Sequence, residues 1–596
     1  MGCRRLAAAV LLGVLPGGVV YAQQQAMCHG QEMTGEIKSP ETLPAPVKMT
    51  GIGNGSIAIT AANDDAKMWF TQGLNLLHDF WDYEASRAFE QAVRSDPKCA
   101  MCYWGLYQAA SFRGGVAWGD DALMKAKALS GHASKAEQLY IKAAVEDHKQ
   151  KATRSKHGPN TGGGKDEAYK DSKETKVLRK LVKTEPNDVQ AKIYLAESMM
   201  NGFDKKGEPK AGTVQGQQLL MAILKEHPDD SAANHYWIHA VEPGNHPELA
   251  LESAKKLGAL TPASGHMVHM PGHIFYRTGD YETARGSFMD SMHVDEAYMK
   301  AQQVSVADDW NYVHNLMYLI ANLMESGRIA EATEVSAKLT HARGAAGGTL
   351  YRQTPRDGLT RLNVDLPVLL RAGEWKAATQ ALEKSAPDAE LKNLAGLRQA
   401  MLDYTQGMLA LEHGGVKAAR QSANALDTYV KAKPEAEKDA MPGMPMTYTA
   451  KDAMAKPLHS FLDVASMELS ASVLLAEGRG VEADAMFKKA ADAERALGYR
   501  EPPMYIRPVE ETRGDALMRA KRYDEAKTAY QAALEERPNS GYPLFGIAQA
   551  DAAAKHGSLA TAEYAHLLAV WAKADADLPQ MQVARAWIES QAVSGQ

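Results

Sequence analysis

The sequence predicts an all-α solenoid, that is, a superhelix of antiparallel helix pairs. Five positions, occupied by glycine, alanine, an aromatic residue, alanine and proline, recur with the same spacing in two distant segments, and runs of alternating β-branched residues, which are typical of strands, are missing. The chain of 596 residues is also longer than one hydrophobic core normally supports, which favours a repeat array. With 45% hydrophobic and 23% charged residues, it has enough apolar material for a folded array.

The repeated pattern places small, aromatic and proline residues at fixed offsets. Its two best copies are Trp69, Gly73, Ala85, Phe89, Ala92, Pro97 and Gly514, Tyr523, Ala526, Tyr530, Ala533, Pro538. The small residues let two helices approach closely, the aromatic residue fills the space between neighbours, and the proline ends the second helix. The pattern therefore predicts a helical hairpin of about 34 residues.

Weaker copies of the pattern fill the region between these two. One unit contains Gly272, Gly279, Tyr281, Ala284 and Phe288, with Pro228 and Pro262 marking two successive repeat ends. Further turns are expected at five glycines that are each followed, five residues later, by an alanine: Gly327, Gly373, Gly414, Gly478 and Gly557. The array is therefore expected to continue through most of the chain.

These offsets resemble those of the tetratricopeptide repeat (TPR) family. The resemblance implies a solenoid whose first helices line a concave groove, and an interaction scaffold with a protein or peptide partner in that groove. More narrowly, residues 265–274, Gly-His-Met-Val-His-Met-Pro-Gly-His-Ile, are similar to a segment in a group of exported bacterial repeat proteins.

Residues 1–22 have the features of a signal peptide. Arg4 and Arg5 precede an apolar run that is shorter than the ~20 residues a membrane span needs, and Ala22 ends a cleavage pattern of small residues. We therefore expect an exported protein, periplasmic or secreted, with no transmembrane segment after cleavage.

The mature chain is expected to divide into an arm and two arrays. Residues 23–60, rich in Gly, Pro and Thr, form an extended arm. The first array covers 61–345 and contains a polar insertion at 147–176, which is predicted to be a solvated loop. The second covers 346–596 and contains a loop rich in Met and Pro at 432–457.

Charge and cysteines restrict the partners and the chemistry. The net charge of −6 becomes about −8 when the two arginines of the signal peptide are removed, which argues against nucleic acid as a partner. Cys28, Cys99 and Cys102 remain, and their pairing is left open. Cys99 and Cys102 form a C-x-x-C motif without a second motif for a zinc site, so two small residues at a helix start are the simpler interpretation.

Histidines are the most unusual feature of the sequence. If each repeat is numbered from the proline that ends it, His266, His269 and His273 share a sector of about 60° on one first helix. The neighbouring repeats place further candidates on the same side, namely His235, His239, Glu242 and His314. Because adjacent first helices stand about 8–10 Å apart, imidazoles from two of them can meet.

This pattern predicts a transition-metal site. Two histidines one helical turn apart, as in His235/His239 and His269/His273, can ligate one ion, and neutral imidazole suits copper and zinc. Glu242 is a candidate ligand, orienting group or general base. Pro271 lies within the same helix and is expected to kink it.

Methionine gives a second indication of copper, because thioether sulfur favours Cu(I). Met267 and Met270 accompany the histidines and Met441, Met444 and Met446 crowd one loop, although methionines at helical spacing also fill cores. The sequence thus favours a metal-handling protein or a metalloenzyme that binds copper or zinc. The alternative is a TPR interaction scaffold without metal, and whether the protein is an enzyme stays open.

Overall fold

The computed structural model describes residues 39–112, 117–157, 169–204, 206–342, 355–387, 391–432 and 456–594. These residues form 26 α-helices and no strands, with one isolated β-bridge between Phe203 and Pro209. The predicted all-α class is confirmed. The expected signal peptide, the first part of the arm and Cys28 lie outside the described residues, as do Met441, Met444 and Met446.

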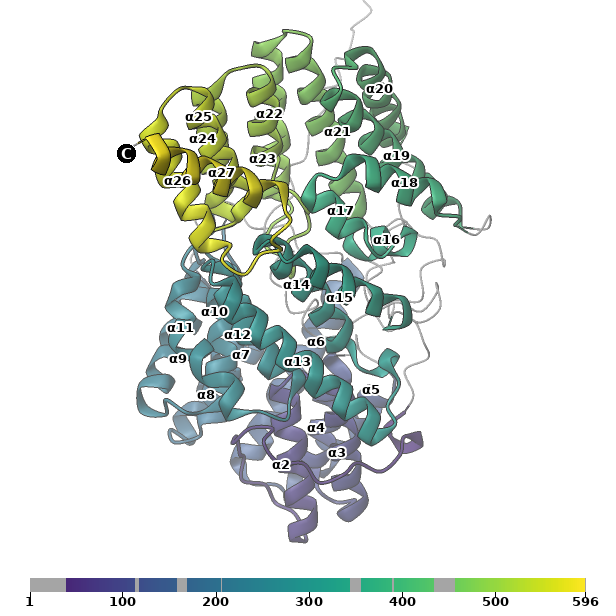
Figure 1. Ribbon diagram of the computed structural model, residues 1–596. Coiled ribbons are helices and arrows are strands. Elements are labelled where there is room, and N and C mark those ends of the chain that lie inside the picture. Colours follow the sequence, from purple (N-terminus) through teal and green to yellow (C-terminus); the bar gives the residue numbers. More distant parts are fainter. Residues whose placement is uncertain are drawn as a thin grey trace, which may run out of the picture.

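The N-terminal array occupies the lower part of Figure 1 and ends at the middle of the molecule. Its helices are α2 (Asp64–His78), α3 (Asp82–Ser95), α4 (Ala100–Phe112), α5 (Ala117–Leu129), α6 (Lys135–His157), α7 (Lys173–Thr184), α8 (Val189–Met199), α9 (Ala211–Glu226), α10 (Ser231–Val241), α11 (Leu251–Leu260), α12 (Gly265–Arg277), α13 (Tyr281–Gln302), α14 (Trp310–Glu325) and α15 (Ile329–Ala342). Four 3-10 turns accompany them: η1 (Pro40–Thr42), η2 (Ser130–His132), η3 (Pro247–Ala250) and η4 (Val306–Asp308).

The C-terminal array forms the upper part of Figure 1. Its helices are α16 (Pro355–Leu362), α17 (Leu366–Ala372), α18 (Trp375–Lys384), α19 (Lys392–Glu412), α20 (Val416–Ala432), α21 (Lys456–Ala476), α22 (Gly480–Ala496), α23 (Val509–Arg519), α24 (Tyr523–Glu536), α25 (Gly541–Ala553), α26 (Gly557–Val570) and α27 (Pro579–Ser594).

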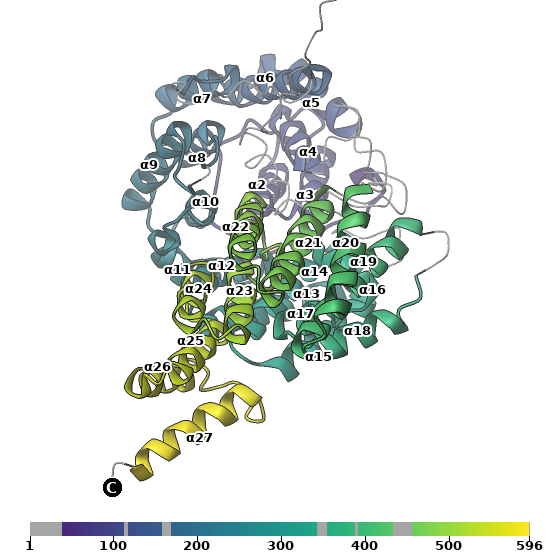
Figure 2. The same ribbon diagram turned by 90° about the horizontal axis from the view of Figure 1, so that it is seen from above.

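Successive helices pack as hairpins, and alternate helices pack side by side. Thus α12 packs on α13 and α21 on α22, while α10, α12 and α14 form one continuous row of first helices. Seen from above, the chain curves from α2 through α6 and α7 to α11, and α27 projects from the far end (Figure 2). This is the expected stack of hairpins, in which each repeat buries its apolar face against its neighbours.

The small residues of the pattern have the predicted role. A Cβ atom at Gly73 would lie 2.8 Å from the ring of Phe89, and one at Gly514 would lie 2.5 Å from the ring of Tyr530. Both distances are shorter than carbon atoms tolerate, so glycine is required where the two helices of each hairpin meet.

Four of the five expected turn glycines end a helix in the left-handed conformation, with φ between 71° and 78°: Gly327, Gly373, Gly414 and Gly478. Gly557 differs, because it is the first residue of α26 and the left-handed residue of that turn is Lys555, with φ 66°. The expected turn is thus present but is made by a different residue.

The described part of the arm lies in extended form along α2. Gln72 donates to the carbonyl oxygen of Val47 at 2.8 Å and accepts from the amide of Met49 at 2.9 Å. Asn75 likewise accepts from the amide of Gly55 at 2.7 Å and donates to the Gly55 carbonyl oxygen at 3.0 Å. The chain's own arm therefore covers part of the surface that the first repeats present.

The polar insertion is shorter than expected. The predicted loop over 147–176 is wrong for its first part, because α6 continues to His157, and α7 already begins at Lys173. The reason is local: the segment up to His157 is rich in Lys, Gln and Ala and contains no glycine or proline before Gly158.

One described helix is long and apolar enough to cross a membrane by length and composition. Residues Leu458–Ala476 of α21 have a mean hydropathy of 1.2, although none of the later segments was expected to qualify. However, 72% of this window is buried inside the array, as in the core helix of a repeat stack.

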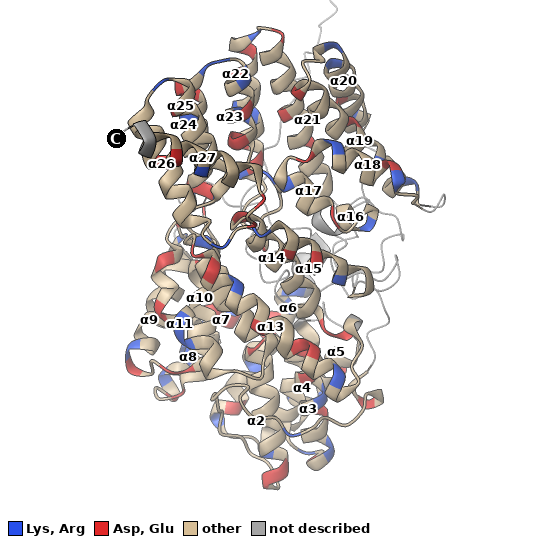
Figure 3. Ribbon diagram, viewed as in Figure 1, with Lys and Arg blue, Asp and Glu red and all other residues tan. Residues whose placement is uncertain are grey.

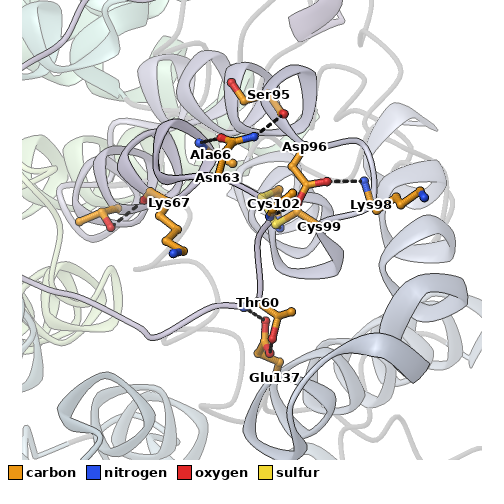
Figure 4. Close-up of a disulfide and its surroundings, with 12 residues drawn as sticks. Thr60, Asn63, Ala66, Lys67, Ser95, Asp96, Lys98, Cys99, Cys102 and Glu137 are labelled. Carbon is orange, nitrogen blue, oxygen red and sulfur yellow. Dashed lines mark hydrogen bonds between the residues drawn. A yellow bond between two sulfur atoms is a disulfide. The ribbon is translucent and has the colours of Figure 1, made fainter.

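Cys99 and Cys102 form a disulfide at the start of α4 (Figure 4), which corrects the simpler interpretation of two unpaired small residues. One helical turn brings the two sulfur atoms together, with the Cα atoms 5.4 Å apart.

Charges of both signs are interspersed along the helices in the view of Figure 3.

Candidate metal centre

Three neighbouring first helices bring the predicted histidines together at the middle of the molecule. Helix α10 carries His235 and His239, α12 carries His266, His269 and His273, and α14 carries His314. Five of the six residues are at most 3% exposed, and the side chain of His239 is 16% exposed. The predicted convergence is therefore present, and the rings that converge are buried.

The six histidines divide into two groups of three. We call His235, His239 and His266 histidine group A, and His269, His273 and His314 histidine group B. Within each group, one nitrogen atom of every ring lies within 4.8 Å of one nitrogen of the other two. One ring nitrogen of His239 and one carboxylate oxygen each of Glu242 and Glu501 also lie within 4.8 Å of one another.

Group A converges through its Nε2 atoms. The Nε2 atom of His235 lies 3.0 Å from that of His239 and 3.2 Å from that of His266. In group B, the Nε2 atoms of His269 and His273 are 2.6 Å apart, and the ring of His314 packs against that of His269 with 4.8 Å between centroids.

The Nδ1 atoms point the other way, toward oxygen atoms. Their partners are the His78 carbonyl for His235 (2.6 Å), Glu242 Oε1 for His239 (2.7 Å), Asn311 Oδ1 for His266 (3.2 Å), Asn315 Oδ1 for His269 (2.7 Å) and Glu242 Oε2 for His273 (2.8 Å). The two amides are oriented by their own contacts: the nitrogen of Asn311 donates to Asp295, and that of Asn315 donates to the Phe288 carbonyl.

These partners decide the tautomers. Carbonyl and carboxylate oxygens only accept, so Nδ1 of each of these five rings carries the hydrogen and donates it. In a neutral ring the Nε2 atom then bears a lone pair, and these lone pairs face one another at 2.6–3.2 Å. Lone pairs at such distances repel, and a shared cation between them removes the repulsion.

Burial favours the neutral rings. The pKa values of His266, His269 and His314 lie well below the usual value for histidine. Loss of solvent is the main cause, and the neighbouring imidazoles are the second. A proton is therefore disfavoured at these rings at neutral pH, and neutral imidazole is the form that binds metal ions.

Glu242 links the two groups. It follows α10 directly, is 1% exposed, and accepts from His239 of group A and from His273 of group B. Burial alone would raise its pKa, but the interactions with the N–H groups of His239 and His273 hold the pKa of this carboxyl well below its usual range. Such carboxylate contacts orient metal-binding histidines in many proteins.

Phe80 covers group A. It follows α2 with a left-handed φ of 57°, which is uncommon for a bulky residue. Its ring packs against His235, His239 and His266, with centroids 4.5, 5.1 and 5.5 Å away. Backbone strain of this kind costs about 1–3 kcal/mol and is concentrated at functional sites.

The segment between α22 and α23 covers the Glu242 side. The hydroxyl of Tyr499 donates to Glu242 Oε2 at 3.3 Å, although the two residues are 257 positions apart. Glu501 lies 3.7 Å from His273 Nδ1 and is 4% exposed. The C-terminal array therefore completes a site whose histidines all come from the N-terminal array.

Several residues of the site were not predicted from the sequence: His78, Phe80, Asn311, Asn315, Tyr499 and Glu501. Only the asparagines carry a local signal, since Asn311 and Asn315 are one turn apart on the helix of His314. The others come from segments whose approach to α10 and α12 depends on the superhelix.

The nearby methionines lie in the apolar core. Met267 and Met270 are fully buried and belong to one hydrophobic cluster with Ile274 and Phe288. Helix α12 runs from Gly265 to Arg277 with Pro271 inside it. Core filling therefore accounts for these two methionines.

One family model matches part of the chain and supports the repeat fold there. Residues 459–554 match the family described as tetratricopeptide repeat-like domain, and no curated protein matches the chain. Among solved structures, the chain is similar to yeast Tom70 (10% identity, 90% of each chain covered, TM-score 0.27). It is also similar to the human IFIT1 dimer with m7Gppp-AAAA (11% identity, 89% of this chain and 95% of that chain, TM-score 0.30).

Proposed function

We propose that this protein binds a transition metal, copper or zinc, through the buried histidine cluster. The observation that carries the proposal is the convergence of imidazole nitrogen atoms in both histidine groups, with Nδ1 next to an oxygen acceptor in five of the rings. Such sets of imidazoles suit copper and zinc, which prefer nitrogen ligands.

In this proposal the six histidines are the ligands and Glu242 orients two of them, His239 and His273, because each of its oxygens accepts from one of these imidazole N–H groups. A bound ion supplies Lewis acidity, or electron transfer in the case of copper. Since five of the six imidazoles are buried, holding an ion is favoured over turnover of a substrate, which needs an open coordination position.

We also propose that the protein works outside the cytoplasm. The signal-peptide pattern of residues 1–22 is the main support. The disulfide between Cys99 and Cys102 fits an oxidising compartment, where such bonds persist.

The rival function is an interaction scaffold that binds an extended peptide. One observation favours it: Gln72 and Asn75 already hold extended backbone, that of the chain's own arm. The same contacts mean that a partner must displace the arm at this place. The rival function also gives no reason for six histidines converging in the interior, where a peptide cannot reach them.

The test is the metal content of protein purified without an affinity tag, before and after reconstitution with copper or zinc. We expect stoichiometric metal in the wild type and a markedly lower metal content in the double variant His269→Ala, His273→Ala, which removes two of the six ligands. Circular dichroism checks that the variant is folded.

The matched control is His556→Ala, His566→Ala, which removes two half-exposed histidines far from the cluster in the sequence and should leave the metal content unchanged. Metal well below one ion per chain after reconstitution would contradict the proposal and favour the scaffold.

A further inference from the structure

We infer that the cluster is binuclear: histidine groups A and B each hold one ion, and the Glu242 carboxylate couples the two ions. This inference rests on the proposed function and adds the number of ions and the connection between them.

The close nitrogen contacts of the cluster fall into two separate sets. The close Nε2 contacts, at 2.6–3.2 Å, all lie within a group: His235 with His239, His235 with His266, and His269 with His273. Among the described residues, each set of three histidines whose ring nitrogens lie within 4.8 Å of one another also falls within one group. The lone pairs therefore have two points of convergence, and one ion cannot occupy both.

Helix α12 contributes histidines to both groups, and its geometry sets the distance between them. His266 belongs to A and His269 to B, and their rings stack with 6.0 Å between centroids. Because three residues advance a helix by about 4.5 Å, the two points are neighbours along α12. Two ions at such a distance interact electrostatically and magnetically.

Two ions in the cluster would need negative charge beside them. Two cations this close repel each other, and six neutral imidazoles do nothing to offset that repulsion. The structure places two buried carboxylates beside the pair: Glu242, which contacts both groups, and Glu501, 3.7 Å from His273 Nδ1. Glu242 thus acts as a positioning residue for both ions at once.

The experiment titrates metal-free full-length protein with Zn²⁺ and with Cu²⁺ and counts bound ions. We expect two ions per chain in the wild type, and one in either His235→Ala, His239→Ala or His269→Ala, His273→Ala. With Cu²⁺ we also expect an electron paramagnetic resonance signal of a dipolar-coupled pair, which both variants should lose while keeping the signal of an isolated ion.

The outcomes separate the two proposals. One ion in the wild type that either variant removes would overturn the binuclear inference and leave metal binding intact. No bound ion in the wild type would overturn metal binding itself. If a variant does not fold, the coupled signal of the wild type still decides, because an isolated-ion signal at full occupancy contradicts a pair.

Glu242→Gln tests the coupling. The variant removes the charge that both ions share, and its amide N–H₂ group meets an imidazole N–H group. We expect affinity at both groups to fall about 10–100-fold, as for other carboxylates that orient metal-binding histidines. The control is Glu248→Gln, which alters an exposed Glu–His pair and should leave both affinities unchanged. Loss of affinity at one group alone would contradict the shared role.

Discussion

Glu468 of α21 is a buried carboxyl group far from the histidines in the sequence. The hydroxyls of Tyr404 and Tyr505 donate to its Oε2 at 2.6 and 2.5 Å. Burial nevertheless dominates and raises its pKa from 4.5 to about 6. Since the folded state holds this proton more tightly, the stabilising contribution is complete below pH 4.5 and is lost as the pH rises through 6. This loss in the free energy of unfolding amounts to about 2 kcal/mol.

Glu468→Gln should remove this pH dependence, because a neutral amide keeps the two tyrosine contacts without ionising. We expect the melting temperature of the variant to rise relative to the wild type between pH 4.5 and pH 7, as measured by circular dichroism. Parallel pH profiles of the two proteins would contradict a raised pKa at this residue.

Helices α12 and α13 meet at Gly272. A Cβ atom there would lie 2.4 Å from the ring of Phe288, which is fully buried and packs against His269. The close approach of the two helices therefore positions the histidines of α12 as well as stabilising the hairpin.

Gly272→Ala should destabilise the fold by about 1–3 kcal/mol through overpacking, and should weaken metal binding, because α12 carries ligands of both groups. Thermal unfolding and a metal titration measure the two effects. Gly286→Ala on α13 is the matched control: no atom outside its own helix lies within 4 Å, so the substitution should stabilise by about 0.5–1 kcal/mol. Equal behaviour of the two variants would rule out the close packing.

A buried ion network connects the two arrays. Arg371 of α17 donates to Glu325 at the end of α14 at 2.7 Å and to Glu511 of α23 at 3.0 Å. All three side chains are at most 3% exposed. This network holds α23 next to the N-terminal array, and the segment before α23 carries Tyr499 and Glu501.

Arg371→Met should cost about 3–5 kcal/mol, because it leaves buried carboxylates without their main partner. We also expect weaker metal binding, since the covering segment loses an anchor. Arg420→Ala breaks a more exposed pair with Glu477 and should cost only about 0–1 kcal/mol. A small loss of stability in Arg371→Met, similar to that of the control, would show that the arrays are held by apolar packing alone.

The local part of this protein could be predicted from its sequence. Gly73 with Phe89 and Gly514 with Tyr530 identify the hairpins, because the contact between two antiparallel helices is set by residues close along the chain. The shared face of His266, His269 and His273 follows from the helical period alone. The neighbouring candidates on α10 and α14 follow from the repeat length.

The contacts between distant segments were decided only by the tertiary structure. The end of α2 returns to α10, so the His78 carbonyl and Phe80 meet group A, and Tyr499 approaches Glu242 from 257 positions away. These approaches depend on the curvature of the superhelix, which accumulates from small rotations at every repeat and is not encoded in one segment. The covering of the cluster by these distant segments follows from that curvature.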